Sequence, residues 1–149
     1  MIRDNPWLVA GGVLSLCASL LHLACIVGGP DWYRFFGAGE RLANLAAAGR
    51  WTPAALAGGI ATALALAAAY AFAGAGLIRP LPLLRTGLVV ISAVYMARGL
   101  ILLKPSVLAR PDLSATFLVW SSLIVLILGL VHVIGTWQAW PALLRGTAH

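Results

Sequence analysis

The sequence predicts an all-α membrane protein, specifically an up-down bundle of four transmembrane helices with a short interfacial helix in the first connection. Of its 149 residues, 62% are hydrophobic and 9% are charged, whereas soluble domains carry about 25% charged residues. At 1.5 Å per residue, a helix of roughly 20 apolar residues crosses the ~30 Å hydrocarbon layer and satisfies its own backbone there. Four stretches of the chain are long enough, and they cover about residues 7–28, 53–78, 81–103 and 113–137. Residues 1–149 are therefore expected to form a single transmembrane domain.

The net charge of +6 does not indicate a nucleic-acid partner. The basic residues stand singly near the ends of the apolar stretches, where they would meet lipid headgroups. The first stretch is expected to remain as an uncleaved span, because its apolar run is longer than the core of a signal peptide. His22 also stands where the lipoprotein pattern before Cys25 would need an aliphatic residue.

The second stretch consists largely of small residues. They recur at every fourth position, at Ala55, Gly59, Ala63, Ala67, Ala71 and Ala75. Lipid gives helices little hydrophobic drive to associate, so close van der Waals contact along such a row must hold them together. We predict that this helix forms the packed centre of the bundle, or contacts a second copy or a membrane-complex partner through Gly59, Ala63 and Ala67. A generally alanine-rich sequence without a special contact is the alternative.

Connections that contain proline mark where the remaining helices end and begin. Residues 79–82 read Arg-Pro-Leu-Pro, and proline both ends one helix and suits the first turn of the next. The second and third helices are thus expected to be antiparallel neighbours. Prolines also bracket the third connection, where Asp112 or Ser114 is available to cap the fourth helix.

The first connection, residues 29–52, is longer than a turn requires and is rich in aromatic residues. Between residues 38 and 48, Leu42 and Leu45 share one helical face, while Glu40, Arg41 and Asn44 crowd another. This pattern predicts a short helix on the membrane surface. Aromatic rings prefer headgroup depth, so anchoring is the simplest role for the segment.

Basic residues alone do not decide the orientation. The face that holds both termini would carry four of them and the opposite face five, a difference too small for the positive-inside rule. Three of the four acidic residues, Asp31, Glu40 and Asp112, fall on the opposite face. We therefore expect both termini to be cytoplasmic.

Arg98 is the main candidate for a functional residue. It lies within the third stretch, roughly 8 Å from its end, and a charge at membrane depth usually pairs, faces a cavity or reaches the surface. Tyr95 is on the same side of that helix. Because the helices alternate in direction, His22 and the loop from Asp31 to Glu40 lie toward the same membrane face. The alternative is that Arg98 only extends to the headgroups.

Together these residues predict a polar pocket on one side of the bundle, roofed by the aromatic loop. The expected lining is His22, Asp31, Trp32, Arg34, Glu40, Tyr95 and Arg98. The Arg98 guanidinium would pair with Asp31 or Glu40, or engage an anionic ligand through its planar fork. We therefore expect a non-enzymatic protein that binds the anionic head of a lipid or small amphiphile.

Two other functions stay open. One is an accessory or assembly subunit of a larger membrane complex. The other is a small membrane enzyme that acts on a lipid-like substrate with His22 and Glu40 as an acid-base pair. Metal-hydrolase, phosphate-loop and serine-nucleophile motifs do not occur. His22 and His132 differ in depth by about 20 Å, too far for one haem, so we expect no metal and no cofactor.

Three motifs carry a resemblance. Residues 28–40 read Gly-Gly-Pro-Asp-Trp-Tyr-Arg-Phe-Phe-Gly-Ala-Gly-Glu, residues 82–87 read Pro-Leu-Leu-Arg-Thr-Gly, and residues 95–99 read Tyr-Met-Ala-Arg-Gly. Through them, most of the chain resembles a family of small, uncharacterised proteobacterial membrane proteins with four helices. The resemblance implies a bacterial inner (plasma) membrane and carries no activity. At fold level the bundle is also similar to the sterol isomerase and sigma-2 receptor family, which binds lipids in an intramembrane cavity, although this chain has no acidic residue inside its helices.

Overall fold

The computed structural model describes residues 5–104 and 115–145. The described part is helical and contains no strand. Its elements are α1 (Pro6–Phe35), α2 (Glu40–Ala47), α3 (Thr52–Gly74), α4 (Leu84–Gly99), the 3-10 helix η1 (Leu100–Leu103) and α6 (Ala115–Arg145). The residues proposed to cap the fourth span, Asp112 and Ser114, lie outside the described residues.

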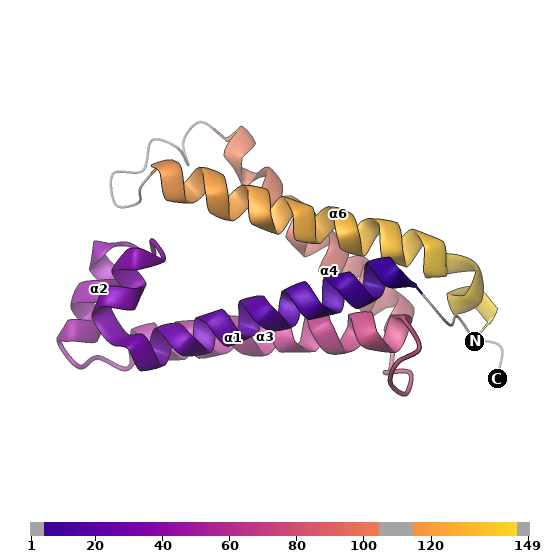
Figure 1. The fold of residues 1–149 in the computed structure, drawn as a ribbon, viewed down its shortest axis with the longest axis horizontal. Helices are drawn as coiled ribbons and strands as arrows, with labels where there is room; N and C mark the ends of the chain where they lie inside the picture. The colour runs from indigo at the N-terminus through magenta and orange to yellow at the C-terminus, as the bar shows by residue number, and fades with distance from the viewer. Residues whose placement is uncertain (1–4, 105–114, 146–149) are drawn as a thin grey trace.

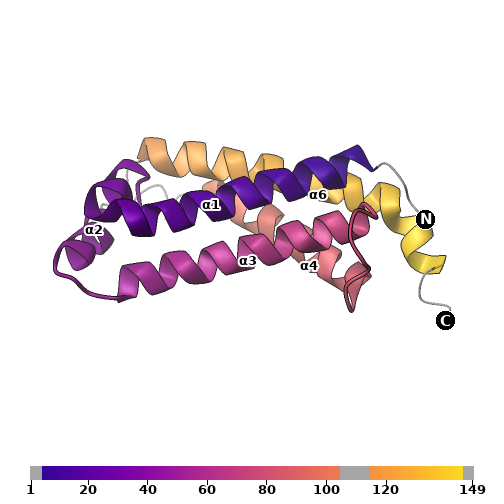
Figure 2. The same cartoon turned by 60° about the horizontal axis from the view of Figure 1, so that its bottom comes forward.

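The long helices run in alternating directions and form two pairs (Figure 1). α1 packs chiefly against α3, and α4 packs chiefly against α6. The pairs converge at the end that holds both termini and diverge toward α2 (Figures 1 and 2). We call these the terminal end and the α2 end. This arrangement confirms the antiparallel order expected from the short connections.

Three helices are long and apolar enough to cross a membrane: Pro6–Phe35, Thr52–Gly74 and Ala115–Leu144. Large apolar side chains cover their outer faces, for example Leu20, Leu66 and Ile124, while hydroxyl groups such as that of Ser122 are buried. This distribution is the reverse of that in a soluble protein and supports a membrane protein. The last helix extends beyond its predicted end at residue 137.

The third predicted span, residues 81–103, is not confirmed as a fourth membrane-crossing helix. The α-helix covers the 16 residues Leu84–Gly99, a length of about 24 Å. It begins late because Pro82 offers no amide hydrogen and Leu83 is left-handed, with φ 54°. It ends at Gly99, where the chain tightens into η1.

A break in α1 coincides with the predicted end of the first span at Gly28. Gly29 has φ 69° and ψ −153°, a conformation that suits glycine, and Pro30 starts the next helical segment. The residues up to Phe35 therefore continue in a new direction toward α2. Helix α2 confirms the short helix expected between residues 38 and 48. Its buried Ala43 packs against Tyr33 and Ala57.

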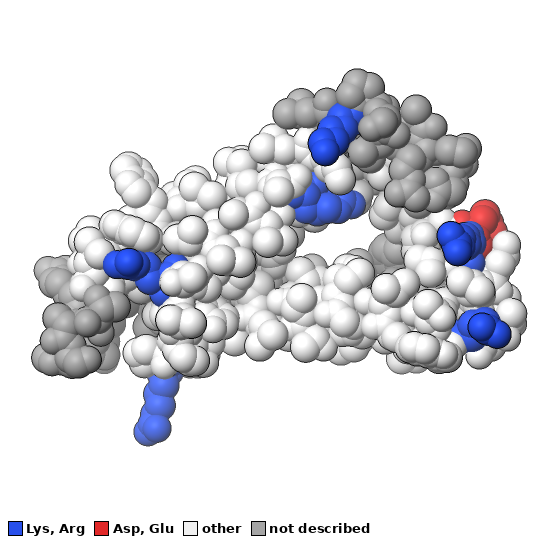
Figure 3. All heavy atoms as spheres, turned by 180° about the vertical axis from the view of Figure 1, so that it is seen from behind, with Lys and Arg blue, Asp and Glu red and all other residues white. Residues whose placement is uncertain are grey.

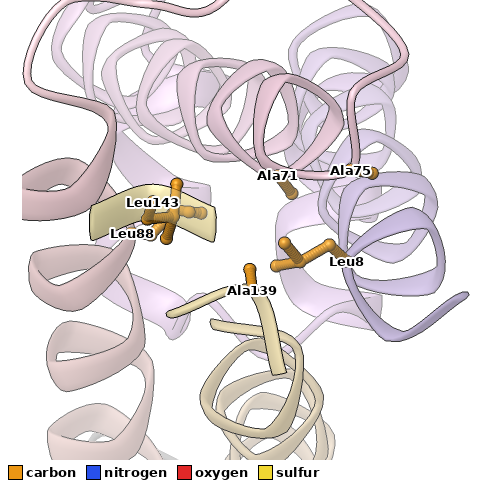
Figure 4. Close-up of a cluster of buried hydrophobic side chains, with 6 residues drawn as sticks. All are labelled: Leu8, Ala71, Ala75, Leu88, Ala139 and Leu143. Atoms are coloured by element: carbon orange, nitrogen blue, oxygen red, sulfur yellow. The ribbon is translucent and has the colours of Figure 1, made fainter. Parts of the chain in front are cut away.

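One hydrophobic core cluster lies at the terminal end, where all four long elements meet around Leu8 (Figure 4). The cluster comprises Leu8, Ala71, Ala75, Leu88, Ala139 and Leu143. Glycines allow this close approach: a Cβ at Gly135 would lie 2.8 Å from Leu8 Cγ, and one at Gly74 would lie 2.9 Å from Leu8 Cδ1. Small residues thus join the two helix pairs here.

The row of small residues in α3 does not stay on one face. Ala67, Ala71 and Ala75 are buried, whereas Ala55, Gly59 and Ala63 are exposed. With 3.6 residues per turn, each step of four residues rotates the row by about 40°. The row therefore passes from the bundle interior at the terminal end to the outer surface at the α2 end.

Candidate functional site

The structure does not gather the seven predicted pocket residues into one lining. Asp31, Trp32, Arg34 and Glu40 lie between the end of α1 and the start of α2, Tyr95 is buried among helices, and Arg98 occupies the last turn of α4. His22 lies on α1. These positions define a surface cluster, an interior cluster and a separate basic site.

The surface cluster consists of Asp31, Arg34, Glu40 and Asn44. The Arg34 guanidinium donates from Nη1 to Asp31 Oδ1 at 3.1 Å, from Nε to Glu40 Oε2 at 3.3 Å and from Nη2 to Asn44 Oδ1 at 3.2 Å. The Asp31 and Glu40 side chains are 92% and 71% exposed, and exposed pairs contribute about 0–1 kcal/mol. The cluster therefore joins α1 to α2, and its charged groups are paired with one another.

The ion pairs of the surface cluster correct one prediction. Asp31 and Glu40 pair with Arg34, and neither forms an ion pair with Arg98 in the described structure. Arg34 stands three residues from Asp31 and six from Glu40 along the chain, so it reaches both without bending the loop over α4. The acidic companion expected for Arg98 is thus not present in the described residues.

Trp32 and His22 also have local roles in the structure. A Cβ at Gly28 would lie 2.1 Å from Trp32 Cγ, so the indole covers the break in α1, with the Phe36 ring at 5.7 Å. His22 Nδ1 lies 2.8 Å from Ala18 O of its own helix. No described hydrogen bond joins His22 to Glu40, so the structure does not assemble the acid-base pair that the enzyme hypothesis requires.

The interior cluster consists of Ser15, Tyr95 and His132. Tyr95 Oη lies 2.9 Å from Ser15 Oγ, and its ring packs edge-on against the His132 ring at 5.0 Å. The imidazole is fully buried against Gly11, and its Nδ1 lies 2.8 Å from Leu128 O. Its Nε2 has no hydrogen-bond partner in the described structure. Tyr95 is therefore held between helices and does not line an open pocket.

Arg98 forms the basic site together with Ser122 of α6. Its Nη1 donates to Ser122 Oγ at 3.0 Å. A guanidinium carries five N–H donors, and this is the one hydrogen bond that Arg98 makes within the described residues. Ser122 is buried while Arg98 is exposed.

An opening passes between the two helix pairs on the α2 side of the molecule (Figure 3). A basic side chain lies on its rim (Figure 3). Arg98 is in the last turn of α4, and Lys104 follows η1. The packing at Gly37 brings the α1–α2 connection against α6, since a Cβ at Gly37 would lie 2.2 Å from Phe117 Cγ. The connection thus contacts the first turn of α6.

The sequence reasoning missed Ser15, Ser122 and the burial of His132. A signal for Ser15 was present, because Ser15 and Ser19 stand four residues apart on one face of α1, and the Ser19 hydroxyl donates to Ala61 O at 2.7 Å. Ser122 and His132 lie in an almost uniformly apolar helix, where the face that meets α4 is not marked by periodicity. Their partners depend on how α4 and α6 cross.

The described residues hold no group of three or more His, Cys, Asp or Glu side chains placed to bind a metal ion. Comparison of the chain with protein-family models, with curated proteins and with solved structures gives no match. The geometry of the basic site is therefore the basis for a functional proposal.

Proposed function

We propose that this protein binds an anionic amphiphile, such as a fatty acid or an anionic lipid, in the opening between its helix pairs. Arg98 and Ser122 would hold the anionic head, and the apolar helix faces would take the tail. The observation that carries the proposal is the Arg98 guanidinium, which has one hydrogen bond and no carboxylate partner among the described residues.

The proposal rests first on the depth of Arg98. With η1 as its continuation, α4 extends over residues 84–103, a length of about 32 Å, and in this proposal it forms a fourth crossing. Arg98 then lies about 10 Å from the nearer end. An arginine at membrane depth costs about 3 kcal/mol unless it is paired or hydrated, so a bound anion would offset this cost.

The chemistry of the guanidinium favours a carboxylate or phosphate. Its planar fork binds either group through two parallel hydrogen bonds, which are stronger than those between neutral groups. The Ser122 hydroxyl fixes Nη1 of Arg98 and leaves the other guanidinium nitrogens for a ligand. The location that we propose is a bacterial inner membrane with both termini cytoplasmic, and no turnover is part of this function.

The test is oleate binding to protein in phosphatidylcholine nanodiscs, measured by native mass spectrometry. Arg98→Gln should lower oleate affinity about tenfold or more, since charge-assisted bonds are lost. Arg98→Lys should lose less because it keeps the charge. The matched control, Arg41→Gln, changes an exposed arginine of α2 and should bind oleate like the parent. Equal oleate binding by the parent and Arg98→Gln would reject the proposal.

A second candidate function is that of an accessory subunit in a membrane complex. The exposed half of the α3 row supports it, because nothing lies within 4 Å of a Cβ placed at Gly59, and a partner helix could approach closely there. Gly59→Cys in a background without Cys17 and Cys25 should form disulfide-linked dimers or cross-link to another protein in native membranes. Absence of both products would remove this candidate.

A further inference from the structure

A groove runs along the outer face of the α4–α6 pair, separate from the opening beside Arg98. Its walls are formed by Val89, Ala93, Met96, Val133, Trp137 and Trp140. Small Ala93 lines the groove together with two bulky indoles. Trp137 is 77% exposed, so its ring forms a raised wall and is not part of the core.

The polar groups on the floor of the groove already have partners within the protein. The floor contains the hydroxyls of Ser92 and Thr136. Ser92 Oγ donates to Leu88 O at 2.8 Å and lies 3.5 Å from Thr136 Oγ1. Because these hydroxyls are engaged within the protein, the groove suits a hydrocarbon chain.

A cation stands at the terminal end of this groove. The Arg85 guanidinium carbon lies 5.3 Å from the centre of the Trp140 ring, a cation–π distance. Arg79 is exposed at the same end. The acidic residues with described side chains, Asp31 and Glu40, lie in the surface cluster at the α2 end, so the charge here is complementary to an anionic headgroup.

The distance from the cation to the far end of the groove also matches a lipid. From Arg85 to Met96, the last α4 residue that lines the groove, there are eleven residues, or about 16 Å, close to half of the ~30 Å hydrocarbon thickness. An acyl chain that begins at an interfacial headgroup extends over about this depth. Tryptophan beside arginine is typical of the membrane interface, which places the headgroup near Trp140.

We infer that this groove holds one acyl chain of an anionic phospholipid whose headgroup is bound by Arg85. The site serves the leaflet at the terminal end, whereas the Arg98 site lies nearer the α2 end, and the two are independent. A second copy of this chain would place a helix in the groove instead, but an unneutralised arginine would then face its own counterpart across a symmetric contact.

The test compares dioleoyl phosphatidylglycerol with dioleoyl phosphatidylcholine, each added to the protein in detergent micelles and counted as bound lipid by native mass spectrometry. Ala93→Trp fills the groove, Arg85→Gln removes the cation, and Val90→Trp is the matched control, since Val90 is exposed on α4 but does not line the groove. We expect Ala93→Trp and Arg85→Gln each to lower phosphatidylglycerol affinity about fivefold. Val90→Trp should not change it.

Phosphatidylcholine should bind more weakly than phosphatidylglycerol and should not respond to Arg85→Gln. Unchanged phosphatidylglycerol binding in both groove variants would overturn the inference, and so would conversion of a dimer to a monomer by Ala93→Trp with lipid binding intact. Arg98→Gln should leave phosphatidylglycerol bound in the groove, and Ala93→Trp should leave oleate binding intact. The failure of one site can thus be distinguished from the failure of the other.

Discussion

At the terminal end four helices meet around Leu8, whereas at the α2 end the two helix pairs stand apart and leave an opening (Figures 1 and 3). Glycine explains much of the difference. At the terminal end, Gly11 lies under the His132 ring and Gly135 under Leu8. At the α2 end, exposed Gly59 meets nothing, and Ala55 and Ala63 of the α3 row are exposed.

The polar groups differ in the same way. At the terminal end, Asn5 accepts from Leu8 N and donates to Gly135 O at 2.7 Å, so its amide joins α1 to α6. At the open end, Arg98 makes one hydrogen bond, to Ser122, among the residues that the structure describes. We propose that one end supplies stability and the other supplies binding, and each prediction below tests that division.

The largest effect is expected at Leu8. Leu8→Ala should reduce the free energy of unfolding by about 3 kcal/mol, because it leaves a cavity where four elements meet. Unfolding by SDS in mixed micelles measures the change. Val27→Ala, at a position that is 90% exposed, serves as the control and should stay close to the parent. Similar losses at both positions would show that the terminal end is not the stabilising core.

A somewhat smaller effect is expected at the α4–α6 contact. A Cβ at Gly99 would lie 2.7 Å from Leu126 Cα, a backbone atom that cannot turn aside. Gly99→Val should therefore separate the helices and cost about 2 kcal/mol in the same unfolding assay. Gly59→Val, in open space on α3, is the control. If both variants melt alike, α4 and α6 do not cross at this glycine.

The interior cluster should contribute less. A double-mutant cycle of Tyr95→Phe and Ser15→Ala should give a coupling of about 0.6 kcal/mol, the usual size for a hydrogen bond between helices in a membrane. Oleate affinity should not change in either variant, because Tyr95 is held within the core. If Tyr95→Phe folds normally but no longer binds oleate, Tyr95 belongs to the ligand site and not to the stabilising end.

The smallest effect is expected in the surface cluster. Arg34→Gln should change stability by less than about 1 kcal/mol, since its partners are exposed and solvent screens the pairs. Thermal unfolding at low and high salt gives the comparison, and the parent should lose any small advantage at high salt. A large loss of oleate binding in Arg34→Gln would show that the surface cluster belongs to the ligand site after all.

The long elements were predictable because a membrane-crossing helix needs only length and apolarity. The break after Gly28 and the short α2 also followed from local chemistry, through Gly29, Pro30 and the amphipathic pattern around Leu42. The third span was predicted too long, since hydropathy does not register the left-handed Leu83 or the tight contact at Gly99.

The candidate site was predicted less well, because depth along a helix does not give direction around it. Asp31 and Arg98 lie in the last turns of α1 and α4, toward the same end of the bundle, yet Asp31 pairs with nearby Arg34, a closer partner that an argument from depth alone overlooks. Ser122 could not be chosen from the sequence, since only the crossing of α4 and α6 brings it to Arg98.

The most direct test of the account is an experimental structure of the protein in a phosphatidylcholine nanodisc with oleate added. We expect density for a carboxylate within about 3 Å of the Arg98 guanidinium nitrogens, with the tail running between the two helix pairs. An empty opening, with Arg98 extended to the lipid headgroups, would contradict the proposed function.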